Sequence, residues 1–130
     1  MKNFLFLLFF APVLALAGQG GNPGLDAITS ALSAGDADAL SKYFGDKVEI
    51  SINEREEVYD KAKATEVLRT FFASSKPKLF DAMHKGQSRE NSDQYCIGKL
   101  NATSGSYRVY VYYRIAGTNT LIQEMRFDKE

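Results

Sequence analysis

Four long segments that read as strands follow one another in the second half of the chain, and they restrict the fold more than any other feature. They span residues 78–88, 94–103, 106–116 and 120–127. The connections between them are 89–93, Ser104-Gly105 and 117–119. Connections this short suit antiparallel hairpins, whereas a parallel pair needs a crossover of about a dozen residues or more. The sequence therefore predicts a mostly antiparallel sheet that curves over the helices covering it.

Two short helices are expected ahead of the sheet. Apolar residues recur at helical spacing from Leu25 to Leu32, and Gly35 follows as a stop signal. Asp36 is placed to cap a second helix, which Gly45 ends. This pattern predicts a bent helical hairpin rather than one long rod.

A strand pair and a longer helix come next. Apolar and polar residues alternate over 47–52, which predicts a strand with one buried face, and a charged turn over 53–57 leads to a short Val58-Tyr59 segment. Asp60 stands as a cap before a helix over 61–75 that has a wide apolar face. The predicted order is α-α-β-β-α-β-β-β-β, which is typical of an α+β fold.

The first seventeen residues have the pattern of a cleavable signal peptide, because Lys2 precedes an apolar run that ends in small residues. The run is too short for a comfortable membrane span, and the only cysteine, Cys96, lies far from the position that a lipoprotein needs. We expect residues 1–17 to be removed, 18–24 to form a flexible glycine-rich leader, and 25–130 to form a single domain. The mature protein is expected in the periplasm or outside the cell, with no membrane span.

Charge and the scarcity of histidine and cysteine argue against several classes of function. The chain has 16 basic and 16 acidic residues with no long run of either sign, whereas nucleic-acid binding needs a basic face. Its single histidine, His84, and its single cysteine, Cys96, lack the spacing of a zinc site and leave no second base for a catalytic triad. We therefore expect no nucleic-acid partner, no metal and no cofactor. Cys96 is expected to act as a small apolar residue of the core.

Motifs spread over nearly the whole mature chain resemble a known family. They are Gly35-Asp36, Leu40 to Phe44, Val48 to Ile50, Val67-Leu68 with Phe71-Phe72, His84 to Ser88, Tyr95 to Gly98, Tyr107 to Tyr110 and Leu121 to Phe127. With the element order, they resemble the nuclear transport factor 2-like (NTF2-like) superfamily, in which a curved sheet wraps around a long helix into a cone. The closer resemblance is to an exported bacterial family known as domain of unknown function 4783. The resemblance implies the fold but no activity, because the superfamily hosts isomerases, dehydratases, transport adaptors and binding domains.

A candidate pocket is expected between the concave face of the sheet and the 61–75 helix. Its expected lining is aromatic and imidazole side chains, namely Tyr43, Phe44, Tyr59, Phe72, Phe80, His84, Tyr110 and Tyr112. Strand alternation places His84 on the face of Phe80, which points the imidazole inward, where it either orients a ligand or hydrogen-bonds within the core. The other face of the tyrosine-rich strand carries Tyr107 and Tyr113, and we expect it to be covered either by a second copy of the chain or by the sheet's own curvature.

The expected function is non-enzymatic binding of a small ligand or a protein partner. An isomerase- or dehydratase-type enzyme is one alternative, with Tyr43, Tyr59 and Asp81 as acid–base candidates that no spacing marks. A homodimeric interaction module is the other. Glu124 is expected to share a strand face with Ile122 and Arg126. A cross-strand pair with Arg108 or Arg114 would explain it without catalysis.

Overall fold

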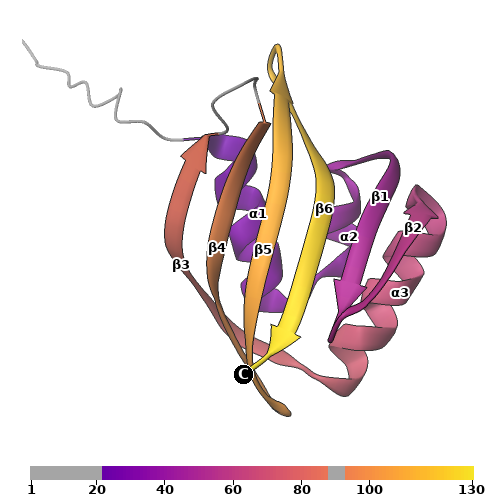
Figure 1. Cartoon of the computed structure of the whole chain (residues 1–130), viewed down its shortest axis with the longest axis vertical. Helices are drawn as coiled ribbons and strands as arrows, with labels where there is room; N and C mark the ends of the chain where they lie inside the picture. The colour runs from indigo at the N-terminus through magenta and orange to yellow at the C-terminus, as the bar shows by residue number, and fades with distance from the viewer. Residues whose placement is uncertain (1–21, 88–92) are drawn as a thin grey trace, which may run out of the picture.

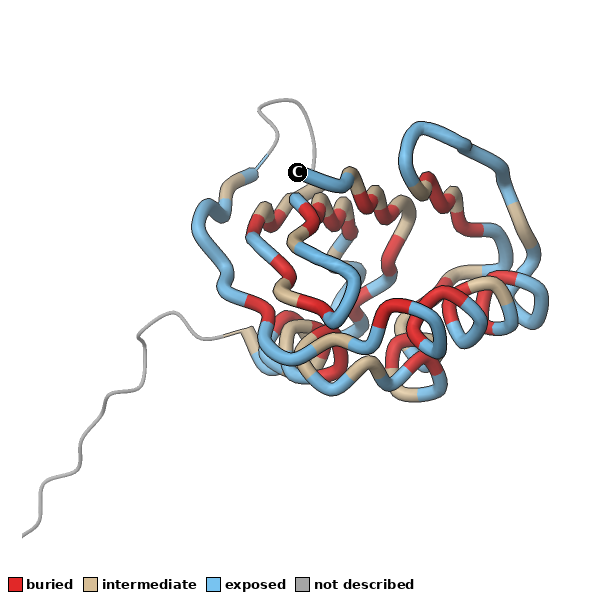
Figure 2. The backbone as a smooth tube through the Cα atoms, turned by 90° about the horizontal axis from the view of Figure 1, so that it is seen from below, coloured by how far each residue is buried: buried red, intermediate tan, exposed pale blue. Residues whose placement is uncertain are grey.

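The computed structural model describes residues 22–87 and 93–130 as one curved sheet with three helices on one of its faces (Figures 1 and 2). The expected signal peptide and residues 18–21 of the expected leader lie outside this part of the chain. The elements are α1 (Pro23–Ala34), α2 (Ala37–Ser41), β1 (Phe44–Ile52), β2 (Arg55–Asp60), α3 (Lys61–Ser74), β3 (Pro77–Gln87), β4 (Asp93–Ala102), β5 (Gly105–Ala116) and β6 (Asn119–Lys129). The predicted element order and the α+β class are confirmed.

The sheet has six strands in the order β2-β1-β6-β5-β4-β3. Four of its neighbouring pairs are antiparallel, and β1 and β6 are parallel. The last strand therefore joins the amino-terminal hairpin to the carboxyl-terminal meander. The helices lie against the inner face, with α1 behind β3 to β5 and α3 behind β1 and β2 (Figures 1 and 2). We call the opposite side of the sheet the outer face.

The first helix begins earlier than the sequence pattern predicts. Asn22 is its N-cap, and the Asn22 Oδ1 accepts hydrogen bonds from the backbone nitrogens of Gly24 at 3.0 Å and Leu25 at 3.2 Å. Pro23 occupies the first turn, where its missing N–H costs nothing. The expected leader is therefore wrong for residues 22–24, which form the cap and the first turn of α1.

The second helix ends earlier than predicted, and Gly45 lies in a strand. The backbone of Tyr43 accepts a 2.6 Å hydrogen bond from the Ile122 N–H, and Phe44 lies opposite Ile122 in the parallel pair. Pairing with β6 thus draws this stretch into an extended conformation. Further along, a two-residue turn at Asn53 and Glu54 has φ values of 52° and 72°, so β2 begins before the predicted segment.

The inner face is filled by packed aromatic and aliphatic side chains. Phe71 of α3 lies 5.0 Å from the Phe127 ring and 5.3 Å from the Tyr107 ring, the latter edge-on. Phe72 meets Phe127 at 6.1 Å. Phe127 is fully buried, so these contacts attach α3 to the two central strands.

One glycine is required by this packing. A Cβ atom on Gly98 of β4 would lie 2.4 Å from the carbonyl oxygen of Asp81 and 2.5 Å from the ring of Phe80. Because glycine has no side chain, Phe80 can turn across β4 into the core. Phe80 also ties α1 to β3, since its backbone N–H donates to the Ser33 hydroxyl at 2.8 Å.

Two bulges decide which side chains face outward. In β3, Ala82 lies opposite Gly98 and His84 opposite Ile97, so Met83 is an extra residue. The extra residue turns His84 to the outer face, where it is exposed, and the prediction that it points inward is wrong. In β6, Gln123 is extra between Ile122 and Glu124.

The bulge in β6 separates two residues that the alternation places together. Ile122 is buried, whereas Glu124 lies on the outer face opposite Tyr112. The nearby arginines have other partners, because Arg108 pairs with Glu130 at 3.2 Å and Arg114 pairs with Asp93 at 2.9 Å. The expected pairing of Glu124 with either arginine is therefore wrong.

The tyrosines of β5 also face the opposite way from the prediction. Tyr107 and Tyr113 are 3% and 2% exposed and point inward, while Tyr110 and Tyr112 lie on the outer face. Tyr107 is accommodated inside because its hydroxyl lies 3.0 Å from the Ser104 hydroxyl and 3.3 Å from that of Ser75. A second copy cannot cover the face that these two tyrosines occupy.

We expect Phe127→Ala to lower the free energy of unfolding by about 3–5 kcal/mol, because it removes the ring that both α3 phenylalanines touch. Urea titration followed by circular dichroism measures this loss. Phe127→Leu should lose less, and Val58→Thr, at a side chain that is 63% exposed, should change stability by less than about 0.5 kcal/mol. Equal losses at Phe127 and Val58 would contradict the packing described.

Candidate functional site

A cavity of about 510 Å³ lies between α3 and the β1–β2 hairpin, and we call it the α3 groove. It lies on the inner side of the sheet, where residues of β1 and β2 face the helix that follows them in the chain. Asp60 ends β2 and caps α3 by accepting from the Lys63 N–H at 2.8 Å, so the chain reverses sharply there. The lining is Ile50, Ile52, Arg55, Tyr59, Lys63, Glu66, Val67, Thr70 and Phe71.

The groove has an apolar floor and a polar rim. Ile50 and Phe71 are buried at its base, and Ile52 and Val67 are half-buried beside them. The Tyr59 ring forms one wall, and its hydroxyl donates to the Glu57 Oε1 at 2.9 Å. That hydrogen bond, with some burial, raises the pKa of Tyr59.

The charged groups at the rim are not all neutralised. Lys63 pairs with Glu66 at 3.3 Å. Both side chains are well exposed, so the attraction between the two charges is weak. Arg55 lies opposite Ile52 at the end of the hairpin. No ion pair to Arg55 is found within the described ranges, 22–87 and 93–130. The rim therefore offers a cationic group above an apolar floor.

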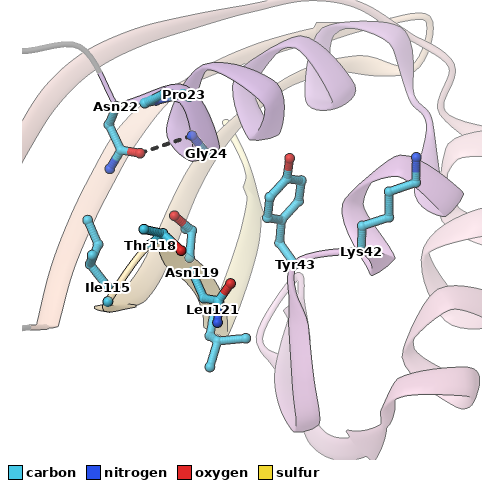
Figure 3. A pocket seen from close by; sticks show the side chains of 11 residues that line it. Asn22, Pro23, Gly24, Lys42, Tyr43, Ile115, Thr118, Asn119 and Leu121 are labelled. Carbon is cyan, nitrogen blue, oxygen red and sulfur yellow. Dashed lines mark hydrogen bonds between the residues drawn. The ribbon is translucent and has the colours of Figure 1, made fainter.

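A second cavity, of about 690 Å³, opens between the start of α1 and the β5–β6 turn, and we call it the hairpin pocket (Figure 3). Figure 3 shows Tyr43 standing between Lys42 and the strand end that carries Asn119 and Leu121. One of its polar side chains has a structural role, since Asn22 caps α1. It is larger than the α3 groove and has the more polar lining of the two.

The eight predicted pocket residues do not share one site. Phe44, Phe72 and Phe80 are buried in the core. Tyr43 lines the hairpin pocket and Tyr59 the α3 groove. The outer face carries the other three, His84, Tyr110 and Tyr112. The expectation of one pocket with this lining is wrong because three phenylalanine rings occupy the space and the strand faces differ from those assumed.

The acid–base trio considered for an enzyme is dispersed in the same way. Tyr43 and Tyr59 lie in different cavities, and Asp81 is exposed on the outer face opposite Lys99. Cys96 is buried, and burial raises the pKa of its thiol. Across the described part of the chain, no three histidine, cysteine or carboxylate side chains gather in a way that suits a metal ion.

The apolar floor of the α3 groove was absent from the predicted lining. Its members carry visible signals, because Ile50 and Ile52 belong to the period-2 alternation and Val67 and Phe71 to the helical stripe. Each pattern indicates a buried face by itself. Neither pattern shows that the buried face of the β1–β2 hairpin and the buried face of α3 leave a gap between them.

Three glutamates form an acidic cluster on the outer face: Glu49 of β1, Glu56 of β2 and Glu124 of β6. Glu49 and Glu124 lie directly opposite each other. A hydrogen bond to Glu56, then burial and the negative charges of Glu124 and Glu56, raise the pKa of the Glu49 carboxyl to about 7, although Arg126 opposes the shift. Burial likewise raises the pKa of Glu124. The cluster therefore holds a proton in the neutral range.

Comparison with known proteins assigns the family. The model of the family described as "Domain of unknown function (DUF4783)" matches residues 25–128. The chain belongs to the DUF4783 family. No sequence among the curated proteins matches it.

Solved structures of other DUF4783 proteins are similar to this one over most of their length. One from Bacteroides ovatus is 33% identical, with a TM-score of 0.75 over 80% of this chain and 93% of its own. One from Bacteroides fragilis is 30% identical, with a TM-score of 0.74 over 80% of this chain and 96% of its own. An NTF2-like protein of unknown function from Cytophaga hutchinsonii is 11% identical, with a TM-score of 0.57 over 82% and 87%. The DUF4783 domain thus has an NTF2-like fold, as the sequence predicts.

None of the helices in the described segments of this DUF4783 protein is long and apolar enough to cross a membrane.

We expect Glu49→Gln to stabilise this DUF4783 domain by on the order of 1 kcal/mol at pH 8, because it removes a charge beside two other carboxylates. The pKa of Glu49 is raised in the folded state, so its proton favours folding at low pH and that stability is lost as pH rises through about 7. The gain from Gln should therefore fade toward pH 5. Urea unfolding at pH 5, 6.5 and 8 measures it.

The matched control is Glu54→Gln, the same change at an exposed carboxyl in the β1–β2 turn. Its effect should not depend on pH in this way. A Glu49→Gln variant that is less stable than the parent at pH 8 would contradict the claim that Glu49 holds a proton in the neutral range. A variant that keeps the parent's pH dependence would contradict it too.

Proposed function

We propose that this DUF4783 domain is a non-enzymatic binding domain that holds the apolar part of a small ligand in the α3 groove. The observation that carries the proposal is the 510 Å³ cavity with an aliphatic and aromatic floor. Ligand sites in proteins commonly enclose about 300–1,000 Å³ and combine an apolar lining with a few polar groups. The groove has both properties.

The rim favours a ligand that carries a negative charge. Arg55 stands at the mouth, and the Lys63 and Glu66 charges cancel each other at 3.3 Å. A carboxylate or sulfonate beside Arg55 gains a charge-assisted hydrogen bond, while the apolar body of the ligand covers Ile52 and Val67. An anionic amphiphile therefore fits the groove better than a neutral or cationic one.

The aromatic wall supports the same class of ligand. The Tyr59 hydroxyl is already hydrogen-bonded to Glu57, so this polar group needs no partner from the ligand. A flat apolar body can then pack against the ring face, as aromatic walls do in many pockets. The export expected from residues 1–17 stays a prediction, and the groove proposal does not depend on it.

The anionic dye 1-anilinonaphthalene-8-sulfonate is a suitable probe, with its neutral relative N-phenyl-1-naphthylamine for comparison. In ¹H–¹⁵N spectra we expect the sulfonate dye to shift the amides of Ile52, Tyr59, Val67 and Thr70. Thr70→Trp, which fills the groove, should weaken binding at least tenfold. Ala73→Trp, at an exposed position one turn further along α3, is the matched control and should leave it unchanged.

The charge at the rim has a test of its own. Arg55→Gln should weaken binding of the sulfonate dye about threefold to tenfold and leave the neutral dye unaffected. Equal loss for both dyes would contradict the role of Arg55. Shifts confined to the hairpin pocket or to the outer face, or no binding at millimolar dye, would refute the α3 groove as the site.

A further inference from the structure

The hairpin pocket carries charge of one sign. Lys42, the residue that caps the end of α2, lines it, and no carboxylate of a described residue does. The whole chain has equal numbers of basic and acidic residues, so this acid-free lining is a local property. Across the described part of the chain, no ion pair to Lys42 is found. Its ammonium group is therefore available to an anion.

The uncharged polar groups of the lining add hydrogen-bonding capacity. The Asn22 Oδ1 accepts from the Gly24 N–H, and Figure 3 shows the Asn22 amide nitrogen turned the other way, with two hydrogens to donate. Thr118 and Asn119 of the β5–β6 turn are exposed and contribute a hydroxyl and an amide. No hydrogen bond joins the Tyr43 hydroxyl to another described residue. The pocket can thus donate to and accept from several hydroxyl groups at once.

Apolar surfaces lie between these polar groups. The Tyr43 ring is half-buried in the lining, and Pro23 lies across from it at the start of α1 (Figure 3). Leu121 also lines the pocket and is 36% exposed, which is high for a large hydrophobic residue. A ring with C–H groups on its faces and hydroxyls at its edge can cover such surfaces and still reach the polar groups.

The first residues of β6 hold the walls of the pocket in place. A Cβ atom on Gly24 would lie 2.3 Å from the Thr120 Oγ1, so the start of α1 rests directly on Thr120. Two residues further along, the Ile122 N–H donates to the Tyr43 carbonyl at 2.6 Å. One strand thus fixes two segments that are distant in sequence. A wall that is already ordered loses less entropy when a ligand binds.

We propose that the hairpin pocket binds a hydroxylated carboxylate of the sugar-acid class. The carboxylate lies at Lys42 and gains a charge-assisted hydrogen bond, and one cation matches one negative charge. The sugar ring packs on Tyr43, and its hydroxyls pair with the Asn22 amide and the side chains of Thr118 and Asn119. The cavity, of about 690 Å³, is within the range of about 300–1,000 Å³ that is usual for ligand sites.

Other anions fit the pocket less well. Phosphate is commonly bound by backbone N–H groups at the start of a helix or by arginine, but the Gly24 and Leu25 N–H groups already donate to the Asn22 Oδ1. No arginine of the described residues lines the pocket. An apolar anion of the kind proposed for the α3 groove would meet a more polar lining here. The inference concerns a different cavity from the α3 groove and does not depend on it.

The test is a ¹H–¹⁵N titration of the chain that begins at Gly18 with sodium D-glucuronate up to 50 mM, at constant ionic strength. D-glucose has the ring without the charge, and sodium acetate has the charge without the ring. We expect glucuronate to bind at least about threefold more tightly than either, because only glucuronate uses both Lys42 and the rest of the lining. The amides that shift should be those of Gly24, Tyr43, Thr118 and Leu121.

Variants separate the charge from the ring. Lys42→Gln should reduce the affinity for glucuronate to that for glucose and leave glucose binding unchanged. Lys47→Gln, the same change at an exposed lysine outside the lining, is the matched control and should alter neither affinity. Tyr43→Ala should weaken both sugars at least about fivefold, because it removes the ring face. Thr70→Trp, which fills the α3 groove, should affect neither sugar.

Several results would overturn the inference, provided that dispersed spectra show each variant to be folded. Absence of shifts at 50 mM glucuronate would do so, as would shifts that spare the hairpin pocket. Glucose binding as tightly as glucuronate, or Lys47→Gln costing as much as Lys42→Gln, would contradict the role of Lys42. Sodium phosphate that binds more tightly than glucuronate would contradict the carboxylate. Loss of glucuronate binding in Thr70→Trp would place the sugar in the α3 groove instead.

Discussion

The contact of Phe71 and Phe72 with the Phe127 ring is the constraint on which the rest of the structure depends. It attaches α3 to β6, the strand that joins the two halves of the sheet. Because these rings and their neighbours are buried, side chains occupy the inside of the cone. The recesses that could hold a ligand are therefore at its margins, where α3 meets the β1–β2 hairpin and where α1 meets the β5–β6 turn.

The parallel pairing of β1 with β6 and the two bulges decide what each face of the sheet presents. Parallel pairing sets Glu49 beside Glu124, and the bulge at Gln123 turns Glu124 outward while Ile122 stays in the core. The bulge at Met83 does the same for His84. The outer face thus gathers charge and aromatic groups, and the inner face gathers the core.

Much of the fold follows from the sequence, and the reasons for the exceptions are physical. The element order and the sheet follow from hydrophobic periodicity and short connections. Strand alternation, however, cannot show which face of β5 is buried, because tyrosines lie on both, and the hydrogen bonds of Tyr107 to Ser75 and Ser104 that hold it inside join segments far apart in the chain. A bulge adds one residue without any local mark in the sequence, so strict alternation places His84 on the wrong face.

The candidate site was harder to predict than the fold. The location between the sheet and α3 agrees with the groove found there, and Tyr59 belongs to its lining. Phe44, Phe72 and Phe80 do not, because an aromatic residue on an inward face fills the core unless the backbone leaves a gap, and such a gap depends on how distant segments pack. The sequence does not predict the three-glutamate cluster, because Glu124 lies far along the chain from Glu49 and Glu56.

A crystal of the chain under xenon pressure tests the central claim most directly, because xenon enters apolar cavities that are not filled by side chains. The packing described predicts xenon in the α3 groove, between Ile52 and Val67. Xenon on the inner face between Phe72 and the central strands would show an open cone and would contradict the account.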